Sequence, residues 1–332
     1  MNAPGAVLDI RDLTLSFATS KGPVTILEGV SLSVGGNEIV GLVGESGSGK
    51  TVTALATMGF LPPAARIESG QIDFEGADLL SLDEQSMRAI RGRRIAMVFQ
   101  SARGALNPLM RIGDQLARVY QIQRAMPQRQ AYREAVDMLR RVGIADAERR
   151  VRAYPHQISG GMAQRVLLAM MIACSPALLI ADEPTTGLDV TIQAQMFDLL
   201  KDIQAQTRAS VLLITHDLGV VAETCRRIVV MYAGQVMETG DCLSIFAQPR
   251  HPYTQHLLSS VMRVDRPVVA PPVGGPPSEA LVYAARGCRF AHRCPIAIDV
   301  CRREALPRIS AGPGHDVMCH RVGEGYGAAA ES

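Results

Sequence analysis

The sequence predicts an α/β fold built on a parallel sheet that helices cover on both faces. Short apolar segments typical of buried strands alternate with segments in which apolar residues recur every three or four positions. The apolar segments cover residues 38–43, 95–99, 177–182 and 211–214, and the helical pattern is clearest over residues 192–203. Because parallel strands are joined by crossover helices, this alternation favours a parallel sheet.

Two regions before the last of these strands follow other patterns. Residues 7–33 alternate apolar and polar side chains around a turn-like segment at residues 19–23, which predicts antiparallel strands. Residues 106–143 carry a helical pattern, with Val136, Leu139 and Val142 at spacings of three. We therefore expect an antiparallel β subdomain and a helical subdomain beside the parallel sheet.

The composition changes after about residue 246. Five prolines and two glycines over residues 267–277 predict a stiff, irregular linker, and a cysteine-rich tail follows it. We expect one domain over residues 1–245, with its helical subdomain at about residues 101–165, and a small irregular C-terminal extension over residues 246–332.

Length and charge exclude several classes of protein. A chain of 332 residues is long enough for two domains. Its formal net charge of +2 gives no reason to expect nucleic acid or anionic lipid as a partner. The longest apolar run, Val166 to Cys174, is about half the length of a membrane-spanning helix. Residues 1–10 show no secretory signal. We expect the chain to stay in the cytosol and to reach a membrane only through a partner.

A phosphate-binding loop is the strongest motif. The segment Gly44-Glu45-Ser46-Gly47-Ser48-Gly49-Lys50-Thr51 matches G-x-x-x-x-G-K-[ST] in full and lies between a predicted strand and a predicted helix. Glycines let the backbone wrap a triphosphate closely, Lys50 supplies a positive charge to it, and Thr51 offers a hydroxyl to Mg²⁺. The alternative, a chance glycine turn, would not need this position between strand and helix.

Acidic residues follow a later strand. Asp182 and Glu183 end the apolar segment that starts at Ala177. A strand-end carboxylate such as Asp182 can hold Mg²⁺, and Glu183 could orient and deprotonate an attacking water. By itself the pair could be a surface Asp-Glu without a role. The phosphate loop upstream makes the hydrolytic interpretation the better one.

Two more side chains follow strands of the same predicted sheet. His216 comes directly after residues 211–214, where it would face the ligand edge and could bond a γ-phosphate. Gln100 closes residues 95–99, and its amide could touch Mg²⁺ or the water. Neither residue alone would indicate a function. A lone histidine is more often structural, and an isolated glutamine is common in any protein.

A second anion-binding arrangement lies about 110 residues after the phosphate loop. Ser159-Gly160-Gly161 stands at the start of a predicted helix. A single nucleotide would not easily need both helix starts of one subunit. A head-to-tail pair of subunits would use both, each Ser-Gly-Gly facing the other subunit's ATP.

Taken in chain order, these features resemble the ATP-binding-cassette (ABC) ATPases, which have a P-loop NTPase core. The matching set is the phosphate loop, Gln100, Ser159-Gly160-Gly161, Asp182-Glu183, Asp189 and His216, and the resemblance covers about residues 7–245. It implies that Ser159 and Gly161 contact the γ-phosphate of the partner's ATP and that Asp189 lies at the dimer seam. It also puts Phe17 where an aromatic ring stacks on adenine, although Phe17 could equally be a strand core residue. The usual signature Leu-Ser-Gly-Gly-Gln has Ile158 and Met162 at its ends here.

A finer resemblance is to the ATPases of peptide and nickel importers. It rests on Leu106-Asn107-Pro108, on His251-Pro252-Tyr253-Thr254 and on the tail from Gly287 to Pro295. The resemblance implies a peripheral protein on the cytoplasmic face of the inner membrane. Its implied partners are a second, related or identical ATPase, two membrane permease subunits and an external solute-binding protein. Nucleic acid is not among them.

The cysteines fall into two groups. Cys174, Cys225 and Cys242 lie in apolar surroundings and are expected in the core. The tail holds Cys288, Cys294, Cys301 and Cys319 at spacings C-x5-C-x6-C-x17-C, wider than the pairs of structural zinc sites. The importer resemblance favours a 4Fe-4S cluster on these four thiols. Zinc, with nearby histidines as extra ligands, and thiols without a metal remain alternatives.

The sequence thus predicts an ATPase that drives peptide import. The alternatives are an importer of nickel or another small solute, a cassette ATPase acting on nucleic acid or ribosomes, a subunit that does not hydrolyse ATP, and an exporter. Tandem cassettes and a basic arm, which would favour nucleic acid, are not visible in the sequence.

Overall fold

The computed structural model describes residues 5–98, 102–259, 283 and 286–322. It divides into two compact units. The first unit comprises residues 1–33, 39–80 and 214–332, and the second comprises residues 34–38 and 81–213. The chain therefore leaves the first unit, builds the second, and returns to the first for its last third.

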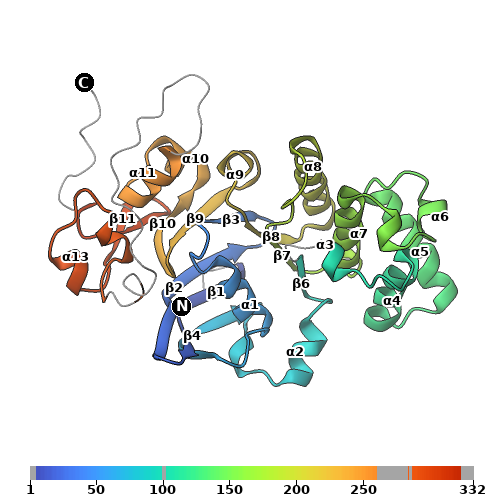
Figure 1. The fold of residues 1–332 in the computed structure, drawn as a ribbon, viewed down its shortest axis with the longest axis horizontal. Coiled ribbons are helices and arrows are strands. Elements are labelled where there is room, and N and C mark those ends of the chain that lie inside the picture. Colours follow the sequence, from blue (N-terminus) through green and yellow to red (C-terminus); the bar gives the residue numbers. More distant parts are fainter. Residues whose placement is uncertain (1–4, 99–101, 260–282, 284–285, 323–332) are drawn as a thin grey trace. The chain divides into compact units, whose positions relative to one another are not determined.

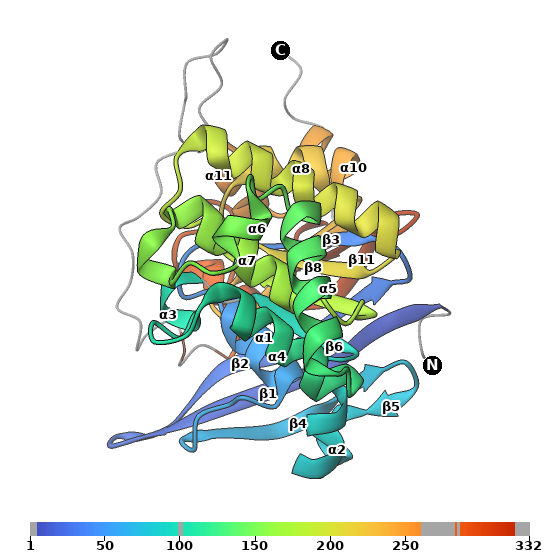
Figure 2. The same ribbon diagram turned by 90° about the vertical axis from the view of Figure 1, so that its right-hand side faces the viewer.

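An antiparallel sheet forms one part of the first unit. Its strands are β1 (Ala6–Thr19), β2 (Gly22–Gly35), β4 (Ala65–Phe74) and β5 (Ala77–Asp78), in the order β2-β1-β4-β5. Figure 2 shows β1, β2 and β4 as long neighbouring ribbons. Leu8 lies opposite Phe74, and Leu8, Ile10, Leu13 and Leu15 are fully buried. The alternating pattern of residues 7–33 thus predicted these strands correctly, because one face of the sheet packs into the core.

The first unit also holds a mixed run of five strands. These are β3 (Ile39–Val43), β9 (Arg227–Tyr232), β10 (Gln235–Asp241), β11 (Arg308–Gly312) and β12 (His315–Met318), in the order β11-β12-β10-β9-β3. Strands β3 and β9 are parallel, whereas β10 is antiparallel to both β9 and β12. The predicted parallel pairing is therefore present between β3 and β9, but the sheet is mixed, because β10 and β12 add antiparallel strands that the sequence did not indicate. Ala233 and Gly234 both have positive φ, 45° and 83°, the conformation of a two-residue turn that reverses the chain between β9 and β10.

The C-terminal extension is less irregular than expected. Strands β11 and β12 form a hairpin that continues the sheet beyond β10, and the tail also contains η3 (Arg289–His292) and α13 (Val300–Arg303). The linker predicted over residues 267–277 lies outside the described residues. The other helices of this unit are α1 (Lys50–Met58), α9 (Leu218–Thr224), α10 (Cys242–Ala247) and α11 (Pro252–Ser259). Figure 1 shows α10 and α11 beside β10.

Three strands form the sheet of the second unit. They are β6 (Ile95–Val98), β7 (Leu178–Asp182) and β8 (Ser210–Ile214), in the order β8-β7-β6. All residues of these strands are buried, and β6 is parallel to β7. Strands buried on both faces read as continuous apolar runs, which is why the sequence located them to within a residue or two.

Helices make up the rest of the second unit. They are α2 (Glu84–Ile90), α3 (Ala102–Ala105), α4 (Ile112–Arg124), α5 (Gln128–Arg141), α6 (Ala147–Arg150), α7 (Gly160–Ile172) and α8 (Val190–Thr207). The short 3-10 turns are η1 (Leu79–Ser81), where the chain passes in sequence from the first unit to the second, and η2 (Pro155–Gln157). Figure 1 shows α4, α5 and α6 grouped beside α7. The helical pattern of residues 106–143 corresponds to α4 and α5, which pack on each other.

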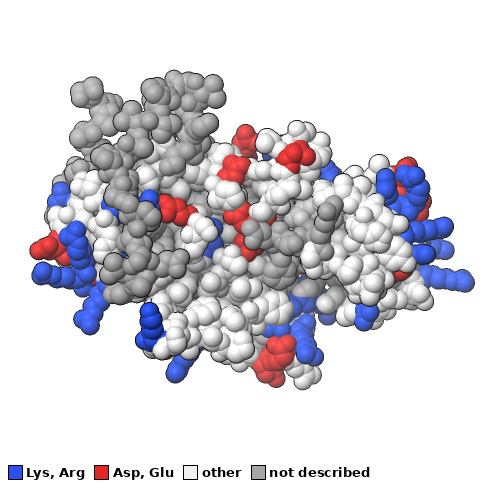
Figure 3. Space-filling model, viewed as in Figure 1, with Lys and Arg blue, Asp and Glu red and all other residues white. Residues whose placement is uncertain are grey.

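Arginines dominate the outer surface of this helical group. Exposed arginines of α5 and α6 include Arg129, Arg133, Arg141 and Arg149. Figure 3 shows blue side chains gathered where Figure 1 draws this helical group. Arg140 is paired with Asp137 and Glu148. Within the part of the chain that the structure describes, no helix is both long and apolar enough to cross a membrane.

The three cysteines expected in the core behave differently. Cys225 and Cys242 are buried, and burial raises the pKa of the Cys242 thiol to about 11. Cys174, at the end of α7, is only partly buried. The expectation was thus wrong for Cys174, because a position just past a helix end keeps one side open to solvent.

Candidate nucleotide-binding site

The phosphate loop, Gly44–Thr51, joins β3 to α1 in the predicted place. Two of its glycines are required by close approach of the backbone. A Cβ at Gly44 would lie 2.1 Å from the carbonyl oxygen of Met231, and one at Gly49 would lie 2.6 Å from Leu27 Cδ2. Both glycines also have positive φ, 153° and 97°. The loop is therefore a tight cradle that only glycine can form at these positions.

Lys50 lies across this loop. Its Nζ donates hydrogen bonds to the carbonyl oxygens of Gly44 and Glu45 at 2.8 and 2.9 Å and to Ser48 Oγ at 3.1 Å. Lys50 is only 7% exposed, whereas Thr51 is exposed at the start of α1. The ammonium group and the first-turn N–H groups of α1 thus gather positive charge at this loop, which suits a triphosphate.

The two strand-end acids lie in the second unit. Asp182 ends β7 and is 4% exposed. Glu183 follows it with a left-handed backbone, φ 49°, and accepts a hydrogen bond from Thr186 Oγ1 at 3.4 Å. Non-glycine residues with positive φ are uncommon and often mark functional turns. The chain therefore turns sharply at Glu183, a half-buried residue that follows the buried Asp182.

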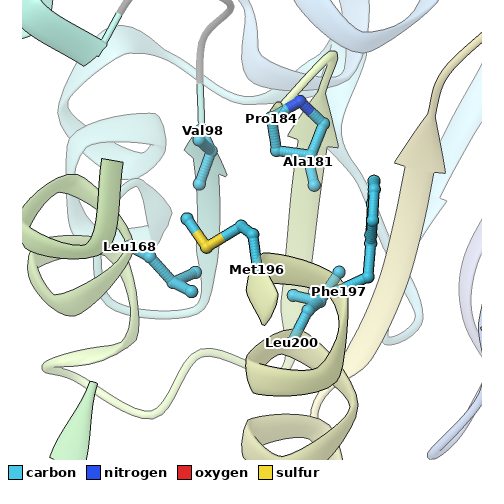
Figure 4. Close-up of a pocket in the computed structure, with 7 residues that line it drawn as sticks. All are labelled: Val98, Leu168, Ala181, Pro184, Met196, Phe197 and Leu200. Carbon is cyan, nitrogen blue, oxygen red and sulfur yellow. The ribbon is translucent and has the colours of Figure 1, made fainter. Parts of the chain in front are cut away.

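A residue without an assigned role from the sequence supports this turn. Gln164 of α7, 4% exposed, donates from its Nε2 to the carbonyl oxygen of Pro184. A small apolar cavity lies behind the same strand end, and Figure 4 shows its lining side chains, which are Val98, Leu168, Ala181, Pro184, Met196, Phe197 and Leu200. Because this lining offers no side-chain hydrogen-bonding group, the cavity belongs to the packing that holds the acidic turn rather than to a ligand site.

Ser159-Gly160-Gly161 and Asp189 begin neighbouring helices of the second unit. Ser159 Oγ accepts from Met162 N–H at 3.3 Å and caps α7, and Asp189 Oδ1 accepts from Ile192 N–H at 2.9 Å and caps α8. A Cβ at Gly161 would lie 2.8 Å from Ile192 Cγ2. Ser159 and Asp189 are both exposed. The two helix starts thus come together as one exposed polar surface.

The remaining predicted site residues have separate positions. His216 is exposed between β8 and α9. Phe17 is half-buried in β1, opposite Ala65. Gln100 lies outside the described residues. The phosphate loop, Phe17 and His216 belong to the first unit, whereas Ser159, Asp182, Glu183 and Asp189 belong to the second.

The sequence missed three contacts that the C-terminal residues make with the phosphate loop. Tyr253 Oη accepts from Glu45 N–H at 2.9 Å, Arg293 forms an ion pair with Glu45 at 2.9 Å, and Tyr283 Oη donates to Gly47 O at 2.8 Å. Tyr253 is fully buried. The His-Pro-Tyr-Thr element drew attention in the sequence only as a resemblance, and nothing in it indicated a partner about 200 residues away.

The four tail cysteines lie in one lobe of the first unit. All seven cysteines of the chain are described, and each is an unbonded thiol. Burial raises the pKa of the Cys288 thiol to about 12 and that of Cys294 to about 11, and nearby thiols, including Cys319, add to both increases. Among the described residues, however, no group of three or more His, Cys, Asp or Glu is arranged to hold a metal ion. The thiols are thus neighbours without forming a ready metal centre.

Comparison with known families agrees with this geometry. Residues 27–186 match the family described as ABC transporter, and residues 237–301 match the oligopeptide/dipeptide transporter C-terminal region. The first match contains the phosphate loop and the acidic turn. The second contains the His-Pro-Tyr-Thr element and three of the four tail cysteines.

Individual proteins match over nearly the whole chain. The dipeptide transport ATP-binding protein of Bacillus subtilis is 46% identical, covering 94% of this chain and 94% of that protein. The oligopeptide transport ATP-binding protein of Salmonella typhimurium is 42% identical, covering 95% and 93%. Among solved structures, a dimeric bacterial ABC transporter cassette matches with a TM-score of 0.63 at 25% identity, covering 71% of this chain and 98% of that one.

Proposed function

Because the chain belongs to the ATP-binding-cassette transporter ATPases, of the oligopeptide and dipeptide type, we propose that it is the ATP-hydrolysing subunit of a peptide importer. The observation that carries this proposal is the identity above 40% with dipeptide and oligopeptide transport ATP-binding proteins over more than nine-tenths of each chain. The catalysed reaction is the hydrolysis of ATP to ADP and phosphate.

The phosphate loop binds the triphosphate in this proposal. Lys50 and the N–H groups at the start of α1 hold the β- and γ-phosphates, and Phe17 stacks on the adenine. Thr51 and Asp182, with Gln100, are the residues that would hold Mg²⁺, whose chemistry is to draw charge from the phosphate oxygens. The burial of Asp182 and the tight cradle at Gly44 support these assignments.

Glu183 acts as the general base. Its carboxylate takes a proton from the water whose oxygen attacks the γ-phosphorus, and the bond to the oxygen bridging the β- and γ-phosphates breaks, leaving ADP with the electron pair. His216 donates a hydrogen bond to the γ-phosphate. The sharp turn at Glu183, fixed by Thr186 and by Gln164 through Pro184, supports this role because it holds the carboxylate in a defined place.

A second ATPase subunit completes the site. Ser159 and Gly161 contact the γ-phosphate bound by the partner, and Asp189 lies at the seam between the subunits. The exposure of both helix caps, Ser159 and Asp189, supports this proposal, because a polar helix start with a reachable N-terminus is a site for an anion from outside the chain. The partner is a related or identical chain.

The membrane partner docks on the helical subdomain. An open apolar groove in the second unit is lined by Asn107, Met110, Val119, Ile122, Met170 and Met171 among others. Ile122 is 66% exposed and Leu109, nearby in the chain, is 85% exposed. Exposed leucine and isoleucine side chains beside half-buried methionines suit a partner helix. The proposal puts the chain on the cytoplasmic face of the inner membrane, beneath two permease subunits that an external solute-binding protein supplies.

The domain division follows from the same proposal. Residues 1–245 form the nucleotide-binding domain, with the helical subdomain at about residues 101–165, and residues 246–332 form the importer-type C-terminal domain. The family match that starts at residue 237 supports a boundary in this region.

The four-cysteine lobe is proposed as the place for a 4Fe-4S cluster, held by Cys288, Cys294, Cys301 and Cys319. The closeness of the thiols supports the proposal, whereas their present arrangement, in which no three form a metal site, does not. Protein purified without oxygen would contain about four irons and four sulfides per chain. If the purified protein contained zinc and no iron, the zinc alternative would replace the cluster. If it contained neither metal, the four cysteines would be thiols without a metal.

Uptake in cells tests the importer proposal. Cells carrying the wild-type chain, Glu183→Gln or the exposed control Glu223→Gln would be given labelled dipeptide, oligopeptide and nickel. We expect Glu183→Gln alone to abolish peptide uptake. Loss of nickel uptake instead would make nickel the cargo. Unchanged uptake of all three, with ATP hydrolysis by the purified chain, would contradict import and favour an ATPase acting on nucleic acid or ribosomes.

A further inference from the structure

The turn between the first two tail cysteines packs against the residues that carry the phosphate loop. This turn, η3, follows Cys288 directly and is separated from Cys294 by Arg293 alone. Arg289, at its start, is 1% exposed, and the side chain of Arg293, just after it, is 14% exposed. Arginine is seldom buried unless it is paired. The partners of these two arginines therefore indicate what the turn does.

Arg293 reaches the second residue of the phosphate loop. Its Nη1 donates to both carboxylate oxygens of Glu45, at 3.2 and 2.9 Å. The guanidinium lies 5.8 Å from the ring centre of Phe290 and 5.9 Å from that of Tyr232. The backbone N–H of Glu45 is held as well, by Tyr253 Oη at 2.9 Å. Glu45 is thus fixed through its side chain and its backbone by two different parts of the C-terminal region.

Arg289 supports the other side of the loop indirectly. It donates to the carbonyl oxygens of Ala233 and Thr25, at 2.5 and 2.9 Å, and forms an ion pair with Glu28 at 3.0 Å. Gly234, the residue after Ala233, donates its N–H to Ser48 O at 2.9 Å. Arg289 therefore holds the turn between β9 and β10, and this turn holds Ser48.

The charge of Glu45 gives these contacts a consequence for ATP. A carboxylate in a loop that binds a triphosphate repels the ligand unless a cation neutralises it. Arg293 is the cation that the structure pairs with Glu45, and the two are separated by 248 positions in the sequence. The Glu45 side chain is 40% exposed, so solvent screens part of the repulsion.

We propose that Arg293 is a positioning residue for ATP binding, which acts by neutralising and fixing Glu45 so that the phosphate loop accepts the triphosphate. This inference rests on the proposed binding of ATP by the loop. It gives the four-cysteine lobe a role at the nucleotide site through the turn that its first two cysteines enclose. The simpler possibility is that the turn only packs against the loop. A neutralising role and a packing role predict different ATP affinities when the charges of Arg293 and Glu45 are removed.

A charge-neutralisation series on the purified chain separates these two possibilities. The variants are Arg293→Gln, Glu45→Gln, the double variant, Arg293→Lys and the control Arg303→Gln. Arg303 belongs to the same lobe, is 77% exposed and lies 3.8 Å from Asp299. The dissociation constant of ATP is measured by calorimetry, KM and kcat from phosphate release, and iron, sulfide and zinc are determined for every variant.

We expect Arg293→Gln to weaken ATP binding about three- to tenfold, through KM with kcat within about twofold, and to do so less at high salt. The double variant should return to within about twofold of wild type, because the uncompensated carboxylate is gone. Arg293→Lys, which keeps the cation, and Arg303→Gln should each bind within about twofold of wild type, and Glu45→Gln should bind ATP no more weakly than the double variant.

Three outcomes would overturn the proposal. Wild-type affinity in Arg293→Gln would remove the role of Arg293. A double variant as weak as Arg293→Gln, with unchanged metal content, would leave only a packing role. Should Arg293→Gln fail to fold, weak binding by Glu45→Gln alone would decide against neutralisation, because that variant carries no repelling charge. If the wild-type chain itself binds no ATP, the proposed function fails, and this inference fails with it.

Discussion

Two helix starts of this chain are suited to anions, and they differ in how complete they are. At α1 the loop supplies a lysine that is 7% exposed, and no side chain caps the helix. At α7 Ser159 caps the helix by accepting from Met162 N–H and remains exposed. The first start has its own cation and is packed against the β9–β10 turn. The second offers only helix N–H groups and a hydroxyl. The start of α1, with its own cation, can therefore bind an anion by itself, whereas the start of α7, without one, can only add to a site completed elsewhere.

The largest expected effect separates binding at α1 from turnover. Glu183→Gln removes the proposed general base but leaves the phosphate loop intact, so ATP hydrolysis should fall about 10²- to 10⁴-fold while ATP affinity is kept. Light scattering should detect a stable closed dimer with ATP, because the bound nucleotide no longer turns over. Glu223→Gln, exposed on α9, is the control. Normal turnover in Glu183→Gln would contradict the general-base assignment.

Removing the cation of the first helix start should have the next largest effect. Lys50→Ala is expected to weaken ATP binding about 10- to 100-fold, because a charge-assisted contact to the phosphates contributes about 1.5–3 kcal/mol. Titration with a fluorescent ATP analogue measures it. Lys201→Ala, whose ammonium pairs with Asp198 at 2.9 Å on α8, should bind as wild type does. Equal loss in both variants would mean that net charge, not the loop, decides affinity.

The second helix start should respond in the opposite way. Ser159→Ala is expected to leave ATP binding by a single chain within about twofold, yet to lower turnover about tenfold, because only the partner's nucleotide would meet this residue. The lost cap should also lower the free energy of unfolding by about 0.5–2 kcal/mol. Turnover is measured above and below the dimerisation concentration. A loss of ATP affinity in dilute protein would place Ser159 at its own chain's nucleotide and break the comparison.

The smallest effect concerns Asp189, which caps α8. Asp189→Asn keeps a capping oxygen for Ile192 N–H and should change the free energy of unfolding by less than about 0.5 kcal/mol, whereas Asp189→Ala should cost about 1 kcal/mol. Thermal unfolding measures both. Turnover that falls equally in both variants would assign the charge of Asp189 to the dimer seam. If turnover falls only in Asp189→Ala, the less stable variant, Asp189 acts only as a helix cap.

The structure corrects the sequence where pairing is non-local. Buried strands such as β7 could be recognised from five consecutive apolar or strand-end residues, since burial on both faces removes polar positions. The direction of β10 could not be read in that way. A turn of Ala233 and Gly234, both at positive φ, reverses the chain, and an alanine gives little warning of that conformation. The hairpin β11–β12 was missed because its short strands are only partly buried.

The sequence alone determined the motifs of the proposed site. The glycine spacing around Lys50 allows a phosphate cradle by local backbone geometry, and Asp182-Glu183 and Ser159-Gly160-Gly161 each follow from their neighbours in the chain. Only the tertiary structure decided what holds those residues. Arg293 meets Glu45, Tyr253 meets the N–H of Glu45, and Gln164 meets Pro184 across 248, 208 and 20 positions. A motif consists of residues close together in the sequence, whereas a long-range ion pair or hydrogen bond depends on which distant segments pack together.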